Sequence, residues 1–534
     1  MNNKNKNIGS DGIDRSTDFL IAGIATVVAL VFAALIFIIP EQMDAMMNAA
    51  FGIVNGGTSW LWVIFFVVCM ILCVWLCVGK YATKKFGDEA PDMSTFSFYA
   101  MIFVFASSAS VVYWAFTEFF FYLETPPWNA APFSIDALHW ASSYSAFHWG
   151  IVPFSAYAIL GVCFAYFVHV QKKDTSRVSA ACAGVIGEKN ANGFLGRIID
   201  GIFLVGIVIS AAGFSMGVSV PIVCTFIEML FGIENNVMLQ GIIIAVVTVC
   251  CAAAMYTGLK KGMAMISRIR TYIFFGLCLF VVLFSGNTVF ILDNMVESIG
   301  WTFQHFIQMT IYTGAVDIAA DGVSANWSQN WTVFFYIMMV AAVVSSGLYY
   351  ANMCKGRTVR ESVLGIIFGS TIGNGVIFWT IGNQSIATYL GDPETFKAAF
   401  AEDPYNAVSM VLGALPFTEV VVAAFLIYAF ISTWSFVQSA IYSMAMVTQP
   451  NLPSDEEPSR VGRMYWCVVT GVLALAFLYI GGLQTVKNAM IWAGVPGLII
   501  SILIIISQFK DMKVRWGGAE KKAPSTAKET VVTE

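Results

Sequence analysis

The chain has 534 residues and a formal net charge of −5 at pH 7; 58% of its residues are hydrophobic and 11% are charged. Soluble domains carry roughly 25% charged residues, so this composition excludes a soluble globular protein and predicts an integral membrane protein. The first apolar run, residues 18–40, has no small-residue cleavage pattern. We therefore expect a retained membrane span there and not a signal peptide.

Charged residues divide the apolar sequence into twelve runs long enough to cross a membrane, since about 20 apolar residues span a hydrocarbon core about 30 Å thick. The predicted spans are residues 18–40, 57–79, 94–123, 144–168, 198–231, 238–258, 264–292, 330–353, 363–390, 417–447, 462–482 and 486–508. The fold class we predict is an all-α integral membrane protein.

The distribution of lysine and arginine predicts the sidedness of these spans. Alternate connections are basic, whereas residues 124–147 and 286–330 contain no lysine or arginine. Positive charge gathers on the cytoplasmic side of membrane proteins. Both termini also carry basic residues, so we expect both to be cytoplasmic, with an even number of spans in the plasma membrane.

Between the seventh and eighth spans, apolar residues at 299, 303, 306 and 307 recur at roughly helical spacing. This predicts an amphipathic helix along the outer surface. The expected divisions of the chain are a cytoplasmic N-terminal tail (1–17), two peripheral transmembrane helices (18–93), a first five-helix repeat (94–292), an extracellular amphipathic segment (293–329), a second five-helix repeat (330–510) and a cytoplasmic C-terminal tail (511–534).

The two repeats are inferred from runs of small and hydroxyl residues, at 105–110 in the third span and 341–347 in the eighth. Each run falls in the first helix of its five-helix unit, and the odd number of helices inverts one unit relative to the other. Broken helices at such matching positions point to a binding site at the bilayer midplane of a transporter. Alternatively, each run only lets two helices pack closely.

The eighth span and its end, WTVFFY…KGRTVRE at 331–361, carry a family signature. They resemble betaine/choline/carnitine transporters, whose eighth span leads into a basic G-R-[ST]-x-R-E segment. YLETPPWN at 122–129, AFHWGIVPFSAY at 146–157 and GLKKG at 258–262 extend the resemblance, which is closest to sodium-independent carnitine/γ-butyrobetaine antiporters. It implies a core of five plus five inverted helices preceded by two helices, and a homotrimer.

The resemblance also implies a box of aromatic rings that holds a trimethylammonium group, each ring contributing about 0.5–2 kcal/mol by cation–π attraction. Trp149 and Tyr157 stand at box positions of the fourth span, where Phe154 replaces a tryptophan. In the third span Trp114 aligns with the family, and Phe121 replaces the tyrosine of the antiporter branch.

The eighth span departs most from the family. Met338 and Met339 replace its usual tryptophan pair, and Ala342 replaces the next ring. Methionine is polarizable and can line an apolar cavity without a ring, or these two residues only pack. Three accounts remain open. The cation is held by the rings of Trp149, Tyr157, Phe121 and Phe154 alone, Trp434 of the tenth span completes the box, or the substrate is not a trimethylammonium compound.

Coupling is expected from Arg270, which aligns with the arginine that the sodium-independent branch uses in place of the ion. A guanidinium does not release its proton, so it supplies permanently the charge that sodium would bring. Sodium-coupled relatives place oxygen ligands in the tenth span, and here those positions read Thr433 and Trp434, so one hydroxyl is lost. The alternative is that Arg270 only marks the cytoplasmic side.

Three further residues are assigned roles with alternatives. Glu118 is a carboxylate inside the third span; it attracts a cationic substrate, carries a proton, or pairs structurally with a buried donor. Trp331 and Phe335, one helical turn apart, match outer-vestibule positions of the antiporter branch, with phenylalanine for tyrosine at the second. Alternatively, their rings face lipid or the membrane interface.

We therefore expect a secondary transporter, not an enzyme, that exchanges a small betaine-like zwitterion or quaternary ammonium compound without sodium. No cofactor, metal site or nucleic-acid partner is expected. One alternative is a proton- or sodium-coupled uptake carrier for a non-quaternary amine or another small zwitterion. The other is a substrate sensor that has kept the fold and lost transport.

Overall fold

The computed structural model describes residues 17–106, 109–173, 175–257, 260–449, 452, 457–480 and 483–517. Within these ranges the ordered elements are helices, and the only β-pairing is one isolated bridge between Lys85 and Thr358. Ten helices are long and apolar enough to cross a membrane, and a pair bent by 112° adds an eleventh. Residues 95–106 and 109–124 form the helices of the third span, which gives the predicted twelve spans, and the predicted all-α membrane fold is confirmed.

The first seven spans follow the predicted order. Their elements, with the short helices between them, are α1 (Phe19–Ile38), α2 (Pro40–Phe51), the π-helix η2 (Gly52–Gly56), α3 (Ser59–Val78), α4 (Thr95–Ala106), α5 (Ala109–Glu124), α6 (Ile135–Phe147), α7 (Ile151–Ala165), η3 (Tyr166–Val170), α8 (Val178–Ala181), α9 (Ala183–Ile186), α10 (Glu188–Ala191), α11 (Phe194–Ile209), η4 (Ser210–Met216), α12 (Gly217–Phe231), α13 (Val237–Thr257) and α14 (Lys260–Phe284).

The rest of the chain forms five more spans and the helices at their ends. These elements are α15 (Thr288–Ile311), α16 (Ala315–Ala319), η5 (Gln329–Val333), α17 (Phe334–Met353), α18 (Val359–Ile377), η6 (Phe378–Gly382), α19 (Asn383–Gly391), α20 (Pro393–Glu402), α21 (Pro404–Gly413), α22 (Thr418–Val447), α23 (Arg460–Ile480) and α24 (Leu483–Arg515). The expected tails lie largely outside the described residues, and α24 continues past the expected start of the C-terminal tail at 511.

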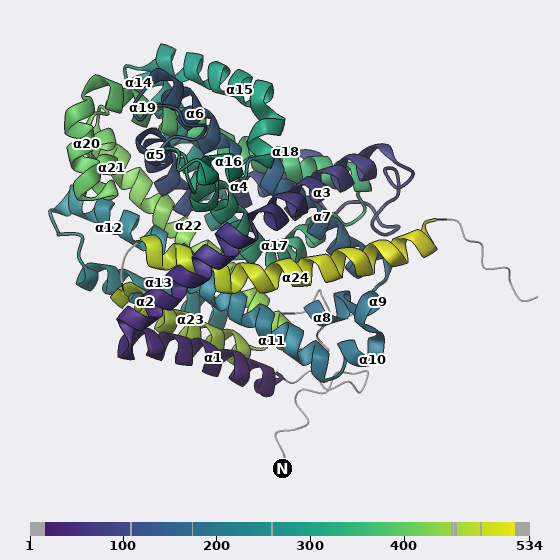
Figure 1. Ribbon diagram of the computed structural model, residues 1–534. Helices are drawn as coiled ribbons and strands as arrows, with labels where there is room; N and C mark the ends of the chain where they lie inside the picture. The colour runs from purple at the N-terminus through teal and green to yellow at the C-terminus, as the bar shows by residue number, and fades with distance from the viewer. Residues whose placement is uncertain are drawn as a thin grey trace, which may run out of the picture.

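Burial separates central from peripheral spans. Within the apolar window of each, 89% of α6–α7–η3 and 83% of η5–α17 is buried, against 39% of α1, 39% of α3 and 28% of α13. Helices α7 and α17 pack against each other, and α24 crosses the molecule beside α17 (Figure 1). The fourth and eighth spans therefore form the protein interior, and the exposed apolar faces of the outer helices meet lipid.

The predicted break in the eighth span is absent, because α17 runs without interruption through residues 341–347. Its small residues serve close packing instead. A Cβ added to Gly347 would lie 2.9 Å from Phe164 and 3.0 Å from Leu160 of α7. The matching run in the third span cannot be compared, since residues 107–108 lie outside the described part of the chain.

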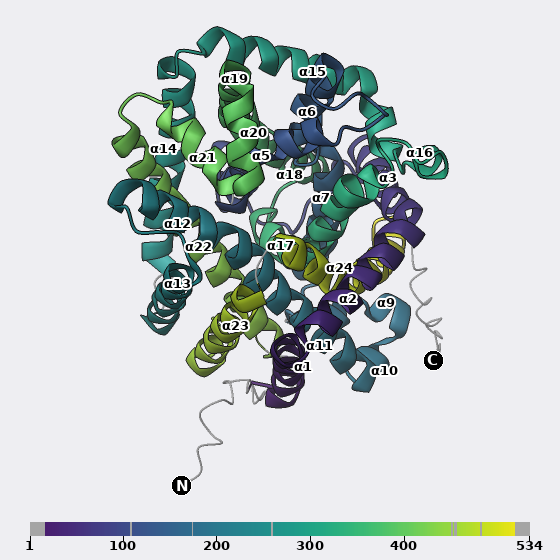
Figure 2. The same cartoon turned by 60° about the vertical axis from the view of Figure 1, so that its left-hand side comes forward.

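The seventh span ends earlier than predicted. Helix α14 stops at Phe284, and α15 leaves it at 112° and lies across the end of the bundle opposite α1 and α10 (Figure 2). Gly286 in the connection has φ +79°, a conformation that glycine adopts without steric cost. Helix α15 exposes Phe303 and Ile307 (72% and 66%), as expected of the predicted amphipathic helix.

The GRTVRE segment joins the first basic connection to the start of α18. Gly356 N–H donates to the Phe86 carbonyl (2.8 Å), and Phe86 N–H donates to the Arg357 carbonyl (3.0 Å). The Arg357 guanidinium donates to the Met93 carbonyl (2.7 Å) and lies over the Phe98 ring, 4.2 Å from its centroid. Thr358 then caps α18 in a reciprocal capping box. Basic connections far apart in sequence thus meet at one end of the bundle.

Gly356→Ala is expected to destabilise this joint. Gly356 has φ +71°, and a Cβ there would lie 2.5 Å from the Glu89 carbonyl oxygen, which is backbone and cannot move aside. We expect a loss of about 1–3 kcal/mol of stability from the strain and the clash, seen as a lower melting temperature of the purified protein. Gly276→Ala is the control, because nothing lies within 4 Å of its added Cβ. Equal melting temperatures for the two variants would contradict the assignment.

Candidate functional site

The fourth span is broken between α6 and α7, and His148, Trp149 and Gly150 form the connection. Gly150 is extended, with φ −113° and ψ −151°, so the helical hydrogen bonding is interrupted there. Pro153 lies in the first turn of α7, where a missing N–H is tolerated. The broken helix that the sequence predicts for the eighth span is therefore found in the fourth, next to the predicted box residue Trp149.

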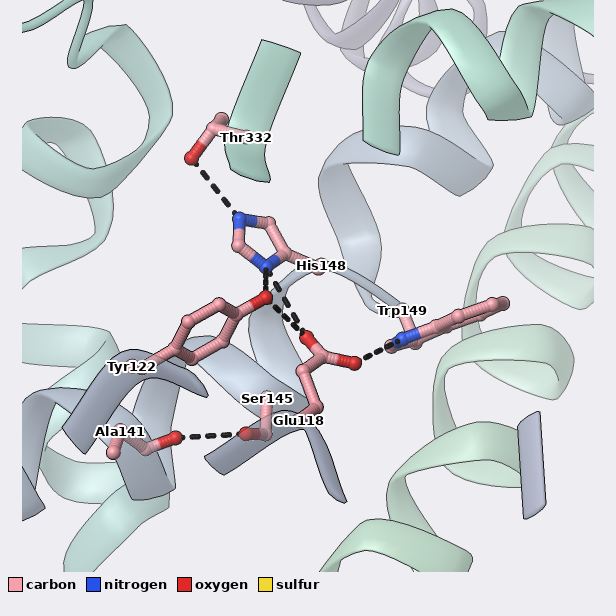
Figure 3. Close-up of polar contacts among 7 residues, drawn as sticks. All are labelled: Glu118, Tyr122, Ala141, Ser145, His148, Trp149 and Thr332. Atoms are coloured by element: carbon pink, nitrogen blue, oxygen red, sulfur yellow. Dashed lines mark hydrogen bonds and ion pairs between the residues drawn. The ribbon is translucent and has the colours of Figure 1, made fainter. Parts of the chain in front are cut away.

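Glu118 of α5 is the centre of a buried polar network at this break (Figure 3). Its Oε1 accepts from the Tyr122 hydroxyl (2.6 Å), and its Oε2 accepts from the Trp149 indole N–H (2.9 Å). His148 Nδ1 lies 2.8 Å from the Tyr122 hydroxyl, and His148 Nε2 lies 3.0 Å from the Thr332 hydroxyl of η5. The network joins the third, fourth and eighth spans and fixes the indole of Trp149.

The network is satisfied with Glu118 in either charge state. With an ionised Glu118, hydrogen bonds run from Thr332 to His148, from His148 to Tyr122 and from Tyr122 to Glu118. With a protonated Glu118 every donor in this chain reverses, and the imidazole changes tautomer while staying neutral. Trp149 donates to Glu118 in both cases. The carboxyl can therefore gain or release a proton without breaking a hydrogen bond.

Five predicted residues form one cluster of rings beside this network. Trp114 lies 5.4 Å from Phe335 and 6.4 Å from Phe121, between ring centroids. Phe335 lies 5.5 Å from Trp149, and Trp331 lies 5.2 Å from Phe121. Trp331 is 7% exposed and Phe335 is fully buried, so these rings do not face lipid. The predicted vestibule and box residues are thus contiguous.

A second group lies one to two turns further along α7 and α17. Phe154 and Tyr157 are buried with their rings 5.4 Å apart. The Tyr157 hydroxyl donates to the Met339 carbonyl (3.2 Å) and lies 3.5 Å from the Met339 sulfur. Met338 is also buried and Ala342 is half-buried. Met339 therefore meets a predicted box residue.

The predicted coupling residues lie where α14, α17 and α22 meet. Arg270 of α14 is 8% exposed. The phenol groups of Tyr428 and Tyr349 lie close enough to its guanidinium to interact with it electrostatically. The Tyr349 ring stacks on Phe105 of α4 at 4.0 Å. On α22, the fully buried Thr433 donates its hydroxyl to the Ala429 carbonyl (2.8 Å) within the same helix. The next residue, Trp434, is half-buried.

Sequence reasoning did not assign four residues that contact the predicted site: Tyr122, His148, Thr332 and Phe378. Phe378 of η6 stacks on Trp149 at 6.0 Å. His148 has no role in the assignments made from sequence, because its partners Glu118 and Thr332 are 30 and 184 residues away. The one feature of the sequence that could have pointed to His148 is its neighbour Trp149, a predicted box residue. Within the described ranges, no group of three or more His, Cys, Asp or Glu residues could hold a metal ion.

A bundle of about twelve spans with rings and polar groups gathered at a broken central helix defines a membrane transporter. Residues 20–516 match the model of the BCCT family, the betaine/carnitine/choline family of transporters. The chain belongs to this family, whose members are transporters and not enzymes, bind small substrates and lie in lipid bilayers. It is also similar to a solved Na+-coupled sialic acid symporter in a substrate-bound outward-open state, at 14% identity and a TM-score of 0.41, over 86% of this chain and 87% of that one. So distant a likeness says nothing about the site.

Proposed function

We propose that the chain is a sodium-independent exchanger of the carnitine/γ-butyrobetaine type, which swaps an external betaine-like zwitterion for a related internal compound. The observation that carries this proposal is the position of Arg270. Its buried guanidinium lies beside α17 and α22, the eighth and tenth spans. A fixed charge there makes a bound sodium ion unnecessary. Because that charge cannot leave the protein, we expect the transporter to change back to its first orientation only when a second substrate is bound.

The site residues of the proposal are the two groups around the fourth-span break. Trp149, Trp114 and Phe121 supply ring faces for the quaternary ammonium, with Trp331 and Phe335 closing the outer side. Phe154, Tyr157, Met338, Met339 and Ala342 line the inner side. The ring faces attract the cation, and methionine adapts to the shape of the alkyl chain. Alternating access would move the substrate from the first group of residues to the second.

The proposed orientation follows from the contacts between connections. The basic connections meet at one end, where Lys355 pairs with Glu89 (2.6 Å), and this end is proposed as cytoplasmic. The connections without lysine or arginine meet at the other, where Asn129 donates to the Ser324 hydroxyl (2.6 Å). Cytoplasmic termini, the division into two five-helix repeats with their flanking segments, a plasma-membrane location and a homotrimer belong to the same proposal.

Counterflow in proteoliposomes tests the function. Vesicles preloaded with γ-butyrobetaine, carnitine or glycine betaine receive labelled external substrate, in sodium and in sodium-free buffer. We expect label uptake that requires an internal quaternary compound and is unchanged without sodium. Uptake that demands sodium would contradict the role of Arg270. Exchange of a primary or secondary amine alone would show that Met338 and Met339 mark a changed substrate class.

Proton-coupled uptake through Glu118 is the second candidate. It is favoured by the hydrogen-bonded chain from Glu118 through Tyr122 and His148 to Thr332. This chain accommodates both charge states of the carboxyl. A pH gradient that drives net uptake into empty vesicles would support it over exchange.

A further inference from the structure

Asn374 of α18 is a buried amide that no site assignment includes. Its side chain is fully buried, and neither Nδ2 nor Oδ1 has a hydrogen-bond partner among the described residues. A buried amide without partners costs about 1–3 kcal/mol. Such groups are rare in native proteins, and a buried amide next to the proposed binding site is free to hydrogen-bond a polar group of the substrate.

The helix register places Asn374 on the face of α18 that meets the site. Ser370 and Phe378, four residues away on either side, lie on the same face. Ser370 contacts the Tyr350 hydroxyl of α17 (3.2 Å between oxygens), and Phe378 stacks on Trp149. Asn374 therefore lies between a contact with the eighth span and a contact with a proposed substrate ring.

The register of α7, which packs against α18, also places Asn374 close to the site. Ile366 of α18 meets Gly161 of α7, whose added Cβ would lie 2.9 Å from the Ile366 Cδ1. The Trp149–Phe378 stack lies twelve residues away from this contact on each side. On α18 the count runs forward from Ile366 to Phe378, and on the α7 side it runs backward from Gly161 to Trp149. Asn374 is thus level with Pro153, one turn from Trp149 and one turn from Tyr157 on the same face of α7. Pro153 has no N–H to donate to the Asn374 amide.

We propose that Asn374 binds the carboxylate of the zwitterion while the rings hold its quaternary ammonium. The chemistry assigns the ends of the ligand. A trimethylammonium group has no N–H donor and is held by ring faces. A carboxylate only accepts hydrogen bonds, and the Asn374 amide offers two donors. This inference rests on the proposed function and adds the group that would distinguish a zwitterion from a simple cation.

The test compares γ-butyrobetaine with butyltrimethylammonium, which has the same cation and chain length and a methyl group in place of the carboxylate. Binding to the purified full-length protein is measured by titration calorimetry for the wild type, Asn374→Ala and Asn374→Asp. We expect both variants to bind γ-butyrobetaine about 10- to 100-fold more weakly, with butyltrimethylammonium changed by less than about 2-fold. Asn374→Asp keeps the side-chain shape and adds charge repulsion toward the carboxylate, so its loss is expected to be the larger.

Thr371→Val is the matched control, since it removes another buried oxygen without a partner from the same helix and should leave the ratio of the two affinities unchanged. Equal weakening of both ligands in the Asn374 variants, or no weakening, would overturn the assignment while leaving the exchanger intact. A wild type that binds neither ligand would overturn the proposed function and the Asn374 assignment together. A lower melting temperature with an unchanged affinity ratio would show that Asn374 only packs.

Discussion

Arg270→Ala is expected to lower exchange in sodium-free buffer by about 5-fold or more. A unit charge acting over about 4–15 Å at an effective dielectric constant of about 20 contributes roughly 1–4 kcal/mol, and 1.4 kcal/mol is a factor of ten. The guanidinium is 8% exposed, so solvent screens it little. The measurement is counterflow of labelled γ-butyrobetaine, with protein folding checked by size-exclusion chromatography.

The loss should depend on charge and not on size. Arg270→Lys keeps the positive charge and is expected to retain most of the exchange, whereas Arg270→Gln resembles alanine. If the arginine stands in for an ion, added sodium should restore part of the exchange in the alanine variant. Exchange at the wild-type rate by Arg270→Ala without sodium would remove the coupling role and leave Arg270 as a marker of sidedness.

The spans could be predicted from sequence because charges interrupt long apolar runs, but the ends of broken helices could not. Residues 289–292 after Gly286 are apolar, so hydropathy continues the seventh span across the bend into α15. Gly286 with φ +79° makes that bend, and a glycine in sequence does not reveal its φ. Likewise the 341–347 run is equally compatible with a broken helix and with close packing. Gly347 against Phe164 shows that packing is the reason.

Some residues of the candidate site could likewise be proposed from sequence, and others could not. Trp149 could be proposed from its motif at 146–157 and Trp114 from its alignment with the family, and both rings lie beside Phe335. His148 and Thr332 could not be paired, since their contact joins residues 184 apart. A side chain whose role depends on partners from three spans has no local pattern. Asn374 is the extreme case, because its significance lies in a side-chain amide that has no hydrogen-bond partner among the described residues.

Glu118→Ala is expected to produce the second large effect, a loss of both stability and exchange. The change leaves the Trp149 indole N–H without its acceptor and takes one partner from the Tyr122 hydroxyl. Each orphaned buried donor costs about 1–3 kcal/mol. Because the indole is then free to turn away from the substrate, exchange should fall about 10-fold or more. Melting temperature and counterflow measure the two losses. Thr117→Val is the control, since the buried Thr117 hydroxyl donates back to the Tyr113 carbonyl of its own helix (2.8 Å) and lies outside the Glu118 network.

Glu118→Gln separates positioning from proton transfer. The glutamine amide can accept from Trp149 and donate to Tyr122, which then donates to His148, so every hydrogen bond of the protonated network is kept. We therefore expect near-normal melting temperature and exchange if Glu118 only positions Trp149. If Glu118 carries a proton, exchange persists but uptake no longer responds to a pH gradient, because an amide does not titrate. A glutamine variant as damaged as alanine would contradict both roles and show that the network requires the negative charge itself.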